Sequence, residues 1–144
     1  MCASGLPEAQ GYDVFRAVQA AFEIISFIEH AKTTHADHIA HFDIRIGLNT
    51  GPIVAGVVGT KKFAYDIWGD SVNVASRMES TSEAGKINVS ESTYELIKDV
   101  YHCEYRGEIN VKNKGMMKMY FVNRVKDHGF VRQLELDIKG VLQT

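Results

Sequence analysis

The segment from Phe42 to Val58 constrains the fold more than any other part of the chain. Apolar residues alternate with polar residues or glycine from Phe42 to Leu48, as they do in a strand with one buried face. The next four residues, NTGP, are typical of a turn, and an almost continuous apolar run follows from Ile53 to Val58. The pattern therefore predicts a β-hairpin, and with it a sheet that other parts of the chain must cover.

Three segments have the pattern of helices. In residues 12–32 apolar side chains recur at spacings of three and four, which gives one core-facing stripe. Residues 69–81 form a second predicted helix, in which Asp70 or Ser71 is placed to accept hydrogen bonds from the free amides of the first turn. Residues 90–98 form the third.

The remaining strand-like segments are short and do not alternate regularly with helices. We expect the end of a strand in residues 1–10, a short loop and strand in 60–70, and strands near 86–89, 103–111 and 118–125. Residues 33–41 are polar and irregular, and the tail after Asp127 is weakly patterned. This mixture predicts an α/β (α+β) fold without a purely parallel sheet. We expect one domain over residues 1–125 and a peripheral tail over 126–144.

Composition excludes several functions. A chain of 144 residues has room for one core, and a net charge of −2 gives no bulk attraction to nucleic acid or to anionic membranes. No apolar run approaches the roughly 20 residues of a membrane helix. Two cysteines without a CxxC spacing favour a reduced, cytoplasmic protein. Any phosphate binding must therefore come from a few well-placed cations.

The segment FAYDIWGDSVNVASRMES, residues 63–80, is the best candidate for chemistry. Asn73 and Arg77 are four residues apart and share one face of the predicted helix, while Asp66 lies just before it between large apolar residues. A carboxylate in such surroundings is costly unless it has a partner. Periodicity alone favours a simpler interpretation, in which Asp66 caps another element, Arg77 pairs with a surface carboxylate and Asn73 is solvated.

Three segments together resemble class III adenylyl and guanylyl cyclases. The segment at residues 63–80 resembles the substrate-binding stretch of that family, FDIRIGLNTGPIVAGVVG resembles the strand pair before it, and RGEINVKNKGMMKMYFV resembles the closing strands. Their order and spacing agree from Phe42 to Val122. The resemblance implies a sandwich related to the ferredoxin-like fold, working as a homodimer or with a second cyclase domain.

The resemblance also implies roles for individual residues. Asp66, with its neighbour Ile67, matches the position that binds the purine base. A carboxylate only accepts hydrogen bonds, which suits the amine of adenine, and guanylyl cyclases usually have cysteine there. Asn73 matches the residue that orients the ribose, and Arg77 matches the one that stabilises charge on the phosphate in the transition state.

A lysine in the turn between the closing strands is implied to bind the terminal phosphates of ATP. The family turn often has the sequence Lys-Gly-Lys-Gly, whereas this chain has Lys112, Asn113, Lys114 and Gly115. The departure leaves the role open between Lys112 and Lys114, and we favour Lys112.

The family reaction needs two divalent metal ions, Mg²⁺ or Mn²⁺, held by two aspartates of the N-terminal part of the domain. The family segment that resembles residues 1–7 comes directly after the second aspartate, so we expect the metal ligands outside this chain and a chain that is inactive alone. The histidines His30, His35, His38 and His41 suggest a metal site, but a solvated polar loop is favoured because no zinc spacing is evident.

The expected function is therefore half of a cyclase active site that converts ATP to cyclic AMP and pyrophosphate. Two alternatives remain open, a guanylyl cyclase and a non-catalytic module that dimerises through the same surface.

Overall fold

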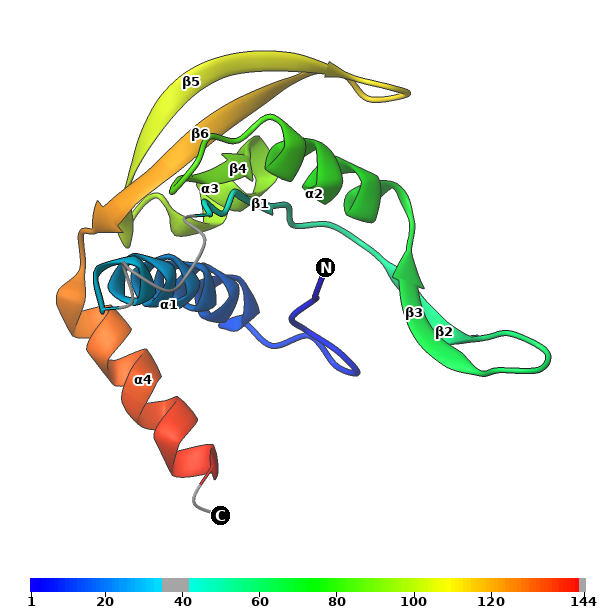
Figure 1. Cartoon of the computed structure of the whole chain (residues 1–144), viewed down its shortest axis with the longest axis horizontal. Coiled ribbons are helices and arrows are strands. Elements are labelled where there is room, and N and C mark those ends of the chain that lie inside the picture. Colours follow the sequence, from blue (N-terminus) through cyan, green and yellow to red (C-terminus); the bar gives the residue numbers. More distant parts are fainter. Residues whose placement is uncertain (35–41, 143–144) are drawn as a thin grey trace.

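A four-stranded sheet forms the centre of the computed structural model, which describes residues 1–34 and 42–142. Its strand order is β1 (Ile46–Leu48), β4 (Ile87–Ser90), β6 (Gly115–Val125) and β5 (Tyr101–Val111). β1 and β4 are parallel, and the other pairs are antiparallel (Figure 1). The mixed sheet agrees with the predicted α+β class.

Helices cover both faces of this sheet, and β4 is therefore buried along its whole length. Ile87 and Val89 belong to the larger core, which α1 (Asp13–Thr34), α3 (Glu91–Ile97) and α4 (His128–Leu142) complete. The smaller core lies under α2 (Asp70–Ser80). It consists of Val74, Met78, Val111 and Met119 with two half-buried neighbours. Alternate side chains of β4 thus serve opposite faces, because successive residues of a strand point to opposite sides.

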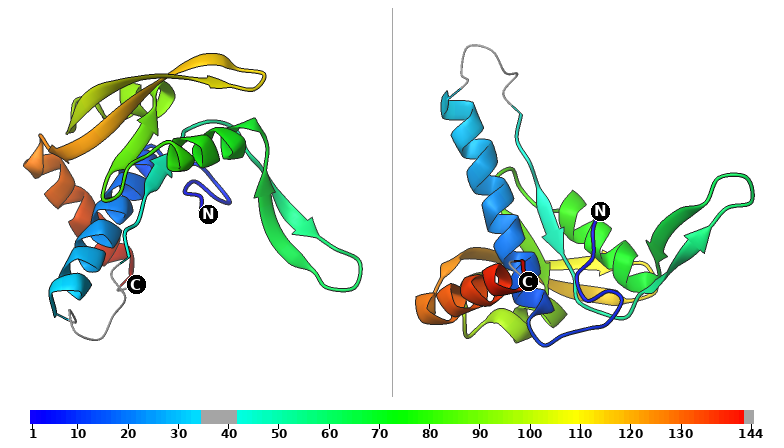
Figure 2. Two further views of the ribbon diagram at one scale, coloured as in Figure 1. Left: turned by 45° about the horizontal axis from the view of Figure 1, so that its top comes forward. Right: turned by 90° about the horizontal axis from the view of Figure 1, so that it is seen from below.

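A second, two-stranded sheet extends away from the body of the molecule (Figures 1 and 2). It pairs β2 (Val54–Val58) with β3 (Ala64–Trp68) in antiparallel register. The hairpin predicted between residues 42–48 and 53–58 is therefore wrong, because β1 pairs with β4 instead. The NTGP segment leads the chain across from one sheet to the other, and Asn49 and Thr50 hydrogen-bond to other elements along the way.

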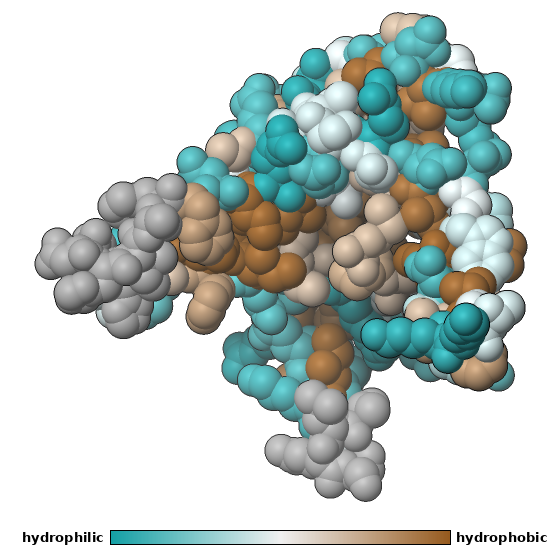
Figure 3. Space-filling model, turned by 45° about the vertical axis from the view of Figure 1, so that its right-hand side comes forward, coloured by the Kyte–Doolittle hydropathy of each residue, from teal (hydrophilic) through white to brown (hydrophobic). Residues whose placement is uncertain are grey.

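Large apolar side chains are exposed on the projecting β2–β3 hairpin. Phe63 is 72% exposed and Tyr65 64% exposed. The others are Val54, Val57, Val58 and Trp68. Apolar side chains also reach the surface over a broad part of the face drawn in Figure 3. Contiguous apolar surface of this kind is typical of protein interaction sites.

Helix α2 packs directly against the backbone of β1. A Cβ atom built on Gly47 would lie 1.9 Å from the amide nitrogen of Glu79, so only glycine permits this distance between helix and strand. At the other end of α2 a Cβ on Gly51 would lie 2.3 Å from Oγ of Ser71. The two glycines of the GLNTG segment therefore determine how closely the helix approaches.

The other predicted elements were mostly confirmed. The helices predicted at residues 12–32, 69–81 and 90–98 are α1, α2 and α3, and the strands near 86–89, 103–111 and 118–125 are β4, β5 and β6. The side-chain cap predicted for α2 is wrong, because Gly69 occupies the cap position and no side chain bonds there.

Two terminal segments differ from the sequence pattern. Residues 1–10 form no strand and belong to neither of the sheets found among the described residues. The weakly patterned tail forms α4, whose Val131 and Leu134 are buried.

Most of the polar segment 33–41 lies outside the described residues. Within residues 1–34 and 42–142, no helix combines the length and apolar character needed to cross a membrane.

We expect Gly47→Ala to lower the free energy of unfolding by at least about 2 kcal/mol, because the new methyl group overlaps the backbone of α2. The matched control is Gly140→Ala in α4, where a Cβ meets no atom within 4 Å. That control should stabilise the chain by about 0.5 kcal/mol, because alanine favours helix. Urea denaturation followed by circular dichroism measures both, and equal effects of the two substitutions would contradict the packing described.

Candidate active site

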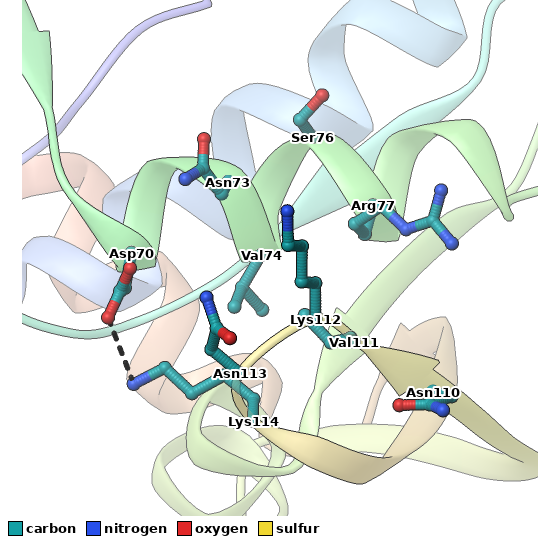
Figure 4. A pocket seen from close by; sticks show the side chains of 10 residues that line it. All are labelled: Asp70, Asn73, Val74, Ser76, Arg77, Asn110, Val111, Lys112, Asn113 and Lys114. Atoms are coloured by element: carbon teal, nitrogen blue, oxygen red, sulfur yellow. Dashed lines mark ion pairs between the residues drawn. The ribbon is translucent and has the colours of Figure 1, made fainter.

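A pocket of about 720 Å³ lies between α2 and the turn that joins β5 to β6 (Figure 4). Its volume falls within the range of about 300–1,000 Å³ that is usual for small-molecule sites. Two short segments line it. They are Asp70, Asn73, Val74, Ser76 and Arg77 from α2, and Asn110 to Lys114 from the turn.

Helix α2 presents Asn73 and Arg77 to this pocket because its opposite side is buried. Val74 and Met78 are 3% and 0% exposed and hold the helix on the sheet, which leaves Asn73 and Arg77 on the exposed side. Among the described residues the Arg77 guanidinium has no ion-pair or hydrogen-bond partner. The simpler interpretation, in which Arg77 pairs with a surface carboxylate, is therefore wrong within the part of the chain that the structure describes.

The turn opposite α2 is tight and has a defined shape. β5 and β6 stay paired up to Val111 and Gly115, and the amide of Lys114 donates to the carbonyl of Val111 at 2.9 Å. Asn113 has a φ of 66°, a conformation that suits glycine or asparagine. The asparagine at the position where the family often has glycine therefore preserves the shape of the turn.

The two lysines of the turn differ in their surroundings. Nζ of Lys114 lies 3.7 Å from a carboxylate oxygen of Asp70 in the first turn of α2. Lys112 makes no ion pair with any described residue, and its side chain extends across the pocket toward α2 (Figure 4). Lys112 is thus the lysine whose charge is uncompensated.

The pocket is a positive site in a chain with a net charge of −2. Arg77, Lys112 and Lys114 supply three cations, and among the described residues of the lining Asp70 alone has a carboxylate. All four side chains are exposed, so water screens each pair, and the attraction for an anion comes from the three cations acting together. Guanidinium and ammonium groups around a cavity of this size suit a phosphate-containing ligand.

Comparison with known proteins identifies the family. The chain matches the family described as "Adenylate and Guanylate cyclase catalytic domain" over residues 1–124. The chain belongs to this family. It is also 40% identical over 144 residues to an adenylate cyclase of Mycobacterium tuberculosis, an alignment that covers 98% of this chain and 32% of that protein. The chain thus spans about a third of that curated relative.

Solved structures of this family share the fold. The guanylate cyclase domain of RhGC from Catenaria anguillulae, in complex with GTP, has 44% sequence identity and a TM-score of 0.76, and the match covers 85% of this chain and 66% of that one. The adenylyl cyclase CyaB from P. aeruginosa has 36% identity and a TM-score of 0.77, with 83% and 64% covered. Both adenylyl and guanylyl enzymes therefore resemble this cyclase chain.

The structure brings together four of the six site residues that were predicted from sequence. Asn73, Arg77, Lys112 and Lys114 all line the pocket, although Lys112 is 35 positions after Arg77 in the chain. The other two lie outside the lining, on the neighbouring strand β3.

Asp66 and Ile67 pair with Gly56 and Ala55 of β2. The Asp66 carboxylate is exposed, and its Oδ1 accepts a hydrogen bond from the amide of Ile67 at 2.8 Å. The apolar neighbours of Asp66 in the sequence suggested a buried carboxylate with a desolvation cost. Because the carboxylate is exposed to water, it does not pay that cost. Base recognition by these two residues stays a prediction.

Two asparagines of the pocket were not predicted from the sequence. Asn110 is the next-to-last residue of β5 and Asn113 lies in the turn, and both residues line the pocket with the lysines. An asparagine in a turn usually serves the backbone, so no signal in the sequence marked these residues as part of a site.

Residues 1–34 and 42–142 offer no group of three or more His, Cys, Asp or Glu side chains placed to hold a metal ion. The pocket carboxylate, Asp70, faces Lys114 instead. The donor set of these described residues therefore does not fit two divalent ions. Of the four histidines for which a solvated polar loop was favoured over a metal site, His30 is exposed on α1, and His35, His38 and His41 lie outside the described residues.

We expect Lys112→Ala to weaken the binding of ATP by about tenfold, the amount that one lost charge-assisted contact to phosphate is worth. Lys114→Ala should weaken it less than about threefold, because Asp70 already compensates that charge. Titration with a fluorescent ATP analogue at low and moderate salt measures both constants. A larger loss for Lys114→Ala would assign the phosphate contact to Lys114 instead.

Proposed function

We propose that this chain supplies the substrate-side half of a class III cyclase active site, which converts ATP to cyclic AMP and pyrophosphate. The observation that carries this proposal is the pocket in which Asn73 and Arg77 of α2 face Lys112 and Lys114 of the β5–β6 turn. The family of the chain supports a cyclase reaction, and the identity of the nucleotide is part of the proposal.

The reaction forms one bond and breaks one bond. The 3′-oxygen of the ribose attacks the α-phosphorus, the bond from that phosphorus to the bridging oxygen breaks, and pyrophosphate leaves with the electron pair. The proton of the 3′-hydroxyl passes to solvent. Negative charge increases on the oxygens around the α-phosphorus as the two events proceed, so a fixed cation beside them lowers the barrier.

Arg77 is the residue we assign to that charge. Its guanidinium has no ion-pair or hydrogen-bond partner among the described residues, so its fork of N–H donors is free to bind phosphate oxygens. Asn73 lies one turn earlier on the same face, and we assign its amide to the ribose, where it orients the 3′-oxygen. Lys112, with Lys114, binds the departing phosphates from the opposite wall.

Adenine is the base we propose, because Asp66 has only acceptor oxygens to offer to the exocyclic amine. β3 leads into α2 through the single residue Gly69, so Asp66 and Ile67 are close in the chain to the ribose and phosphate groups of the site. GTP is the rival substrate, since a guanylate cyclase domain in complex with GTP is among the similar structures.

A second cyclase domain, either another copy or a paired domain, completes the site on this proposal. The exposed apolar side chains of the β2–β3 hairpin offer a surface for such a partner. The two divalent ions, Mg²⁺ or Mn²⁺, would be held by residues outside this chain. We place the reaction in the cytoplasm, where the two free cysteines of the chain stay reduced.

Complementation tests the proposal. A cyclase domain of a relative such as CyaB is prepared with alanine at the two positions that align with Asn73 and Arg77, so that this chain must supply those two side chains. We expect mixing with this chain to restore cyclic AMP production from ATP. Arg77→Ala in this chain should then lower the restored rate by about 10²–10³-fold, as the loss of one fixed charge-stabilising donor usually does.

Two controls make the result decisive. Light scattering shows whether the two chains associate, and Arg124→Ala, a change at an exposed arginine of β6 outside the pocket, should leave the restored rate unchanged. Association without restored activity would reject the catalytic role and support a non-catalytic dimerising module.

Asp66→Cys tests the choice of base. We expect this substitution to shift the ratio of kcat/KM for ATP and GTP toward GTP by at least about tenfold, because it removes the acceptor for the adenine amine and the charge that repels the guanine carbonyl. Rates with both nucleotides in the complemented mixture measure the ratio. An unchanged ratio would show that another residue selects the base.

A further inference from the structure

A network of polar side chains joins the carboxyl ends of β1 and β4 to the start of α2. Asn49, directly after β1, is its centre. Its Oδ1 accepts hydrogen bonds from Oγ of Ser90 at 2.6 Å and Oγ of Ser92 at 3.1 Å, and its Nδ2 donates to the carbonyl of Ser71 at 3.0 Å. Ser90 is 0% exposed and Asn49 is half-buried, so protein groups rather than water satisfy these atoms.

The partners fix the orientation of the Asn49 amide. A backbone carbonyl only accepts hydrogen bonds, so Nδ2 must face Ser71, and the serine hydroxyls donate to Oδ1. Oγ of Ser92 also lies 2.9 Å from the carbonyl of Thr50, so its single proton is shared between that carbonyl and Oδ1 of Asn49, and both contacts hold the same stretch of backbone. The Oδ1 atom of Asn49 is therefore bound to β4 and α3, and its Nδ2 atom makes a single hydrogen bond to α2.

Helix α2 has a matching anchor at its other end. Asn88 of β4 is 0% exposed, and its Nδ2 donates to the carbonyl of Met78 at 2.9 Å. Ser71 and Met78 are seven residues apart, which is about two turns of helix. Asn73 and Arg77, the two pocket residues of α2, lie between these anchors.

We propose that Asn49 is a positioning residue, which sets the place of α2 and thereby aims Asn73 and Arg77 at the ribose and phosphate of the substrate. This inference rests on the proposed function. The glycines on either side of Asn49 allow α2 to approach β1, but they add no directional bond, whereas the Asn49 amide connects to one specific carbonyl. A misplacement of about 1 Å of groups that act on a transition state costs about a hundredfold in rate.

Asn49→Asp isolates the bond to α2. The new side chain keeps an acceptor for Ser90 and Ser92 but loses the donor to Ser71, and it places a carboxylate against that carbonyl. The matched control is Val131→Ala in α4, which opens a cavity in the larger core without contact to α2. We expect both substitutions to lower the thermal stability of the chain. Only Asn49→Asp should also change the position of α2, so a difference between the two variants in kcat reports on positioning.

The two variants are compared with the unchanged chain in the complemented cyclase mixture. We expect Asn49→Asp to lower kcat by tenfold to a hundredfold at saturating ATP, with KM changed less than threefold, and Val131→Ala to change kcat less than twofold. Hydrogen exchange of the chain alone should show faster exchange of the Val72 and Asn73 amides, which bond to the carbonyl of Gly69, in Asn49→Asp only.

These measurements separate this inference from the function on which it rests. Failure of the unchanged chain to restore activity would reject the proposed function. The hydrogen-exchange rates would still show whether Asn49 holds the start of α2 in place. Unaltered exchange at Val72 and Asn73 in Asn49→Asp, or an equal loss of kcat in Val131→Ala, would overturn the positioning role.

Discussion

The close packing of α2 on β1 is the constraint on which the candidate site depends. Because Gly47 has no side chain, the backbone of α2 lies against β1. Val74 and Met78 of the helix pack on the sheet in the smaller core. One face of α2 is thereby buried, and Asn73 and Arg77 are left on the other. If α2 lay farther from the sheet, Asn73 and Arg77 would be displaced relative to the β5–β6 turn. The pocket would then change shape although all of its polar side chains were still present.

The pocket shows how an acidic chain makes a local site for an anion. Its cations come from two segments that are distant in sequence, and a tight turn with Asn113 in a left-handed conformation holds the lysines opposite Arg77. Asp70 compensates Lys114 and leaves Lys112 and Arg77 for a ligand. The arrangement costs little stability, because all these charges are exposed to water.

Much of the fold and of the site follows from the sequence, and the failures have physical causes. Periodicity located α1, α2 and α3 but not α4, and the four-residue spacing of Asn73 and Arg77 was enough to place both on one face of a helix. Pairing was harder, since an apolar run after a turn looks like the second strand of a hairpin whichever strand it finally joins, and β2 joins β3. The role of Asn49 was also hidden, because it depends on Ser71 and Ser90, which only the folded chain brings to it.

We propose that a nucleoside triphosphate binds between α2 and the β5–β6 turn. The most direct measurement is a titration of the isotope-labelled chain with ATP, followed by backbone amide chemical shifts in NMR spectra. We expect the largest shifts in residues 70–77 and 110–114, with saturation that Arg77→Ala weakens. Shifts concentrated on α1 or α4, or shifts that Arg77→Ala leaves unchanged, would contradict this account of the site.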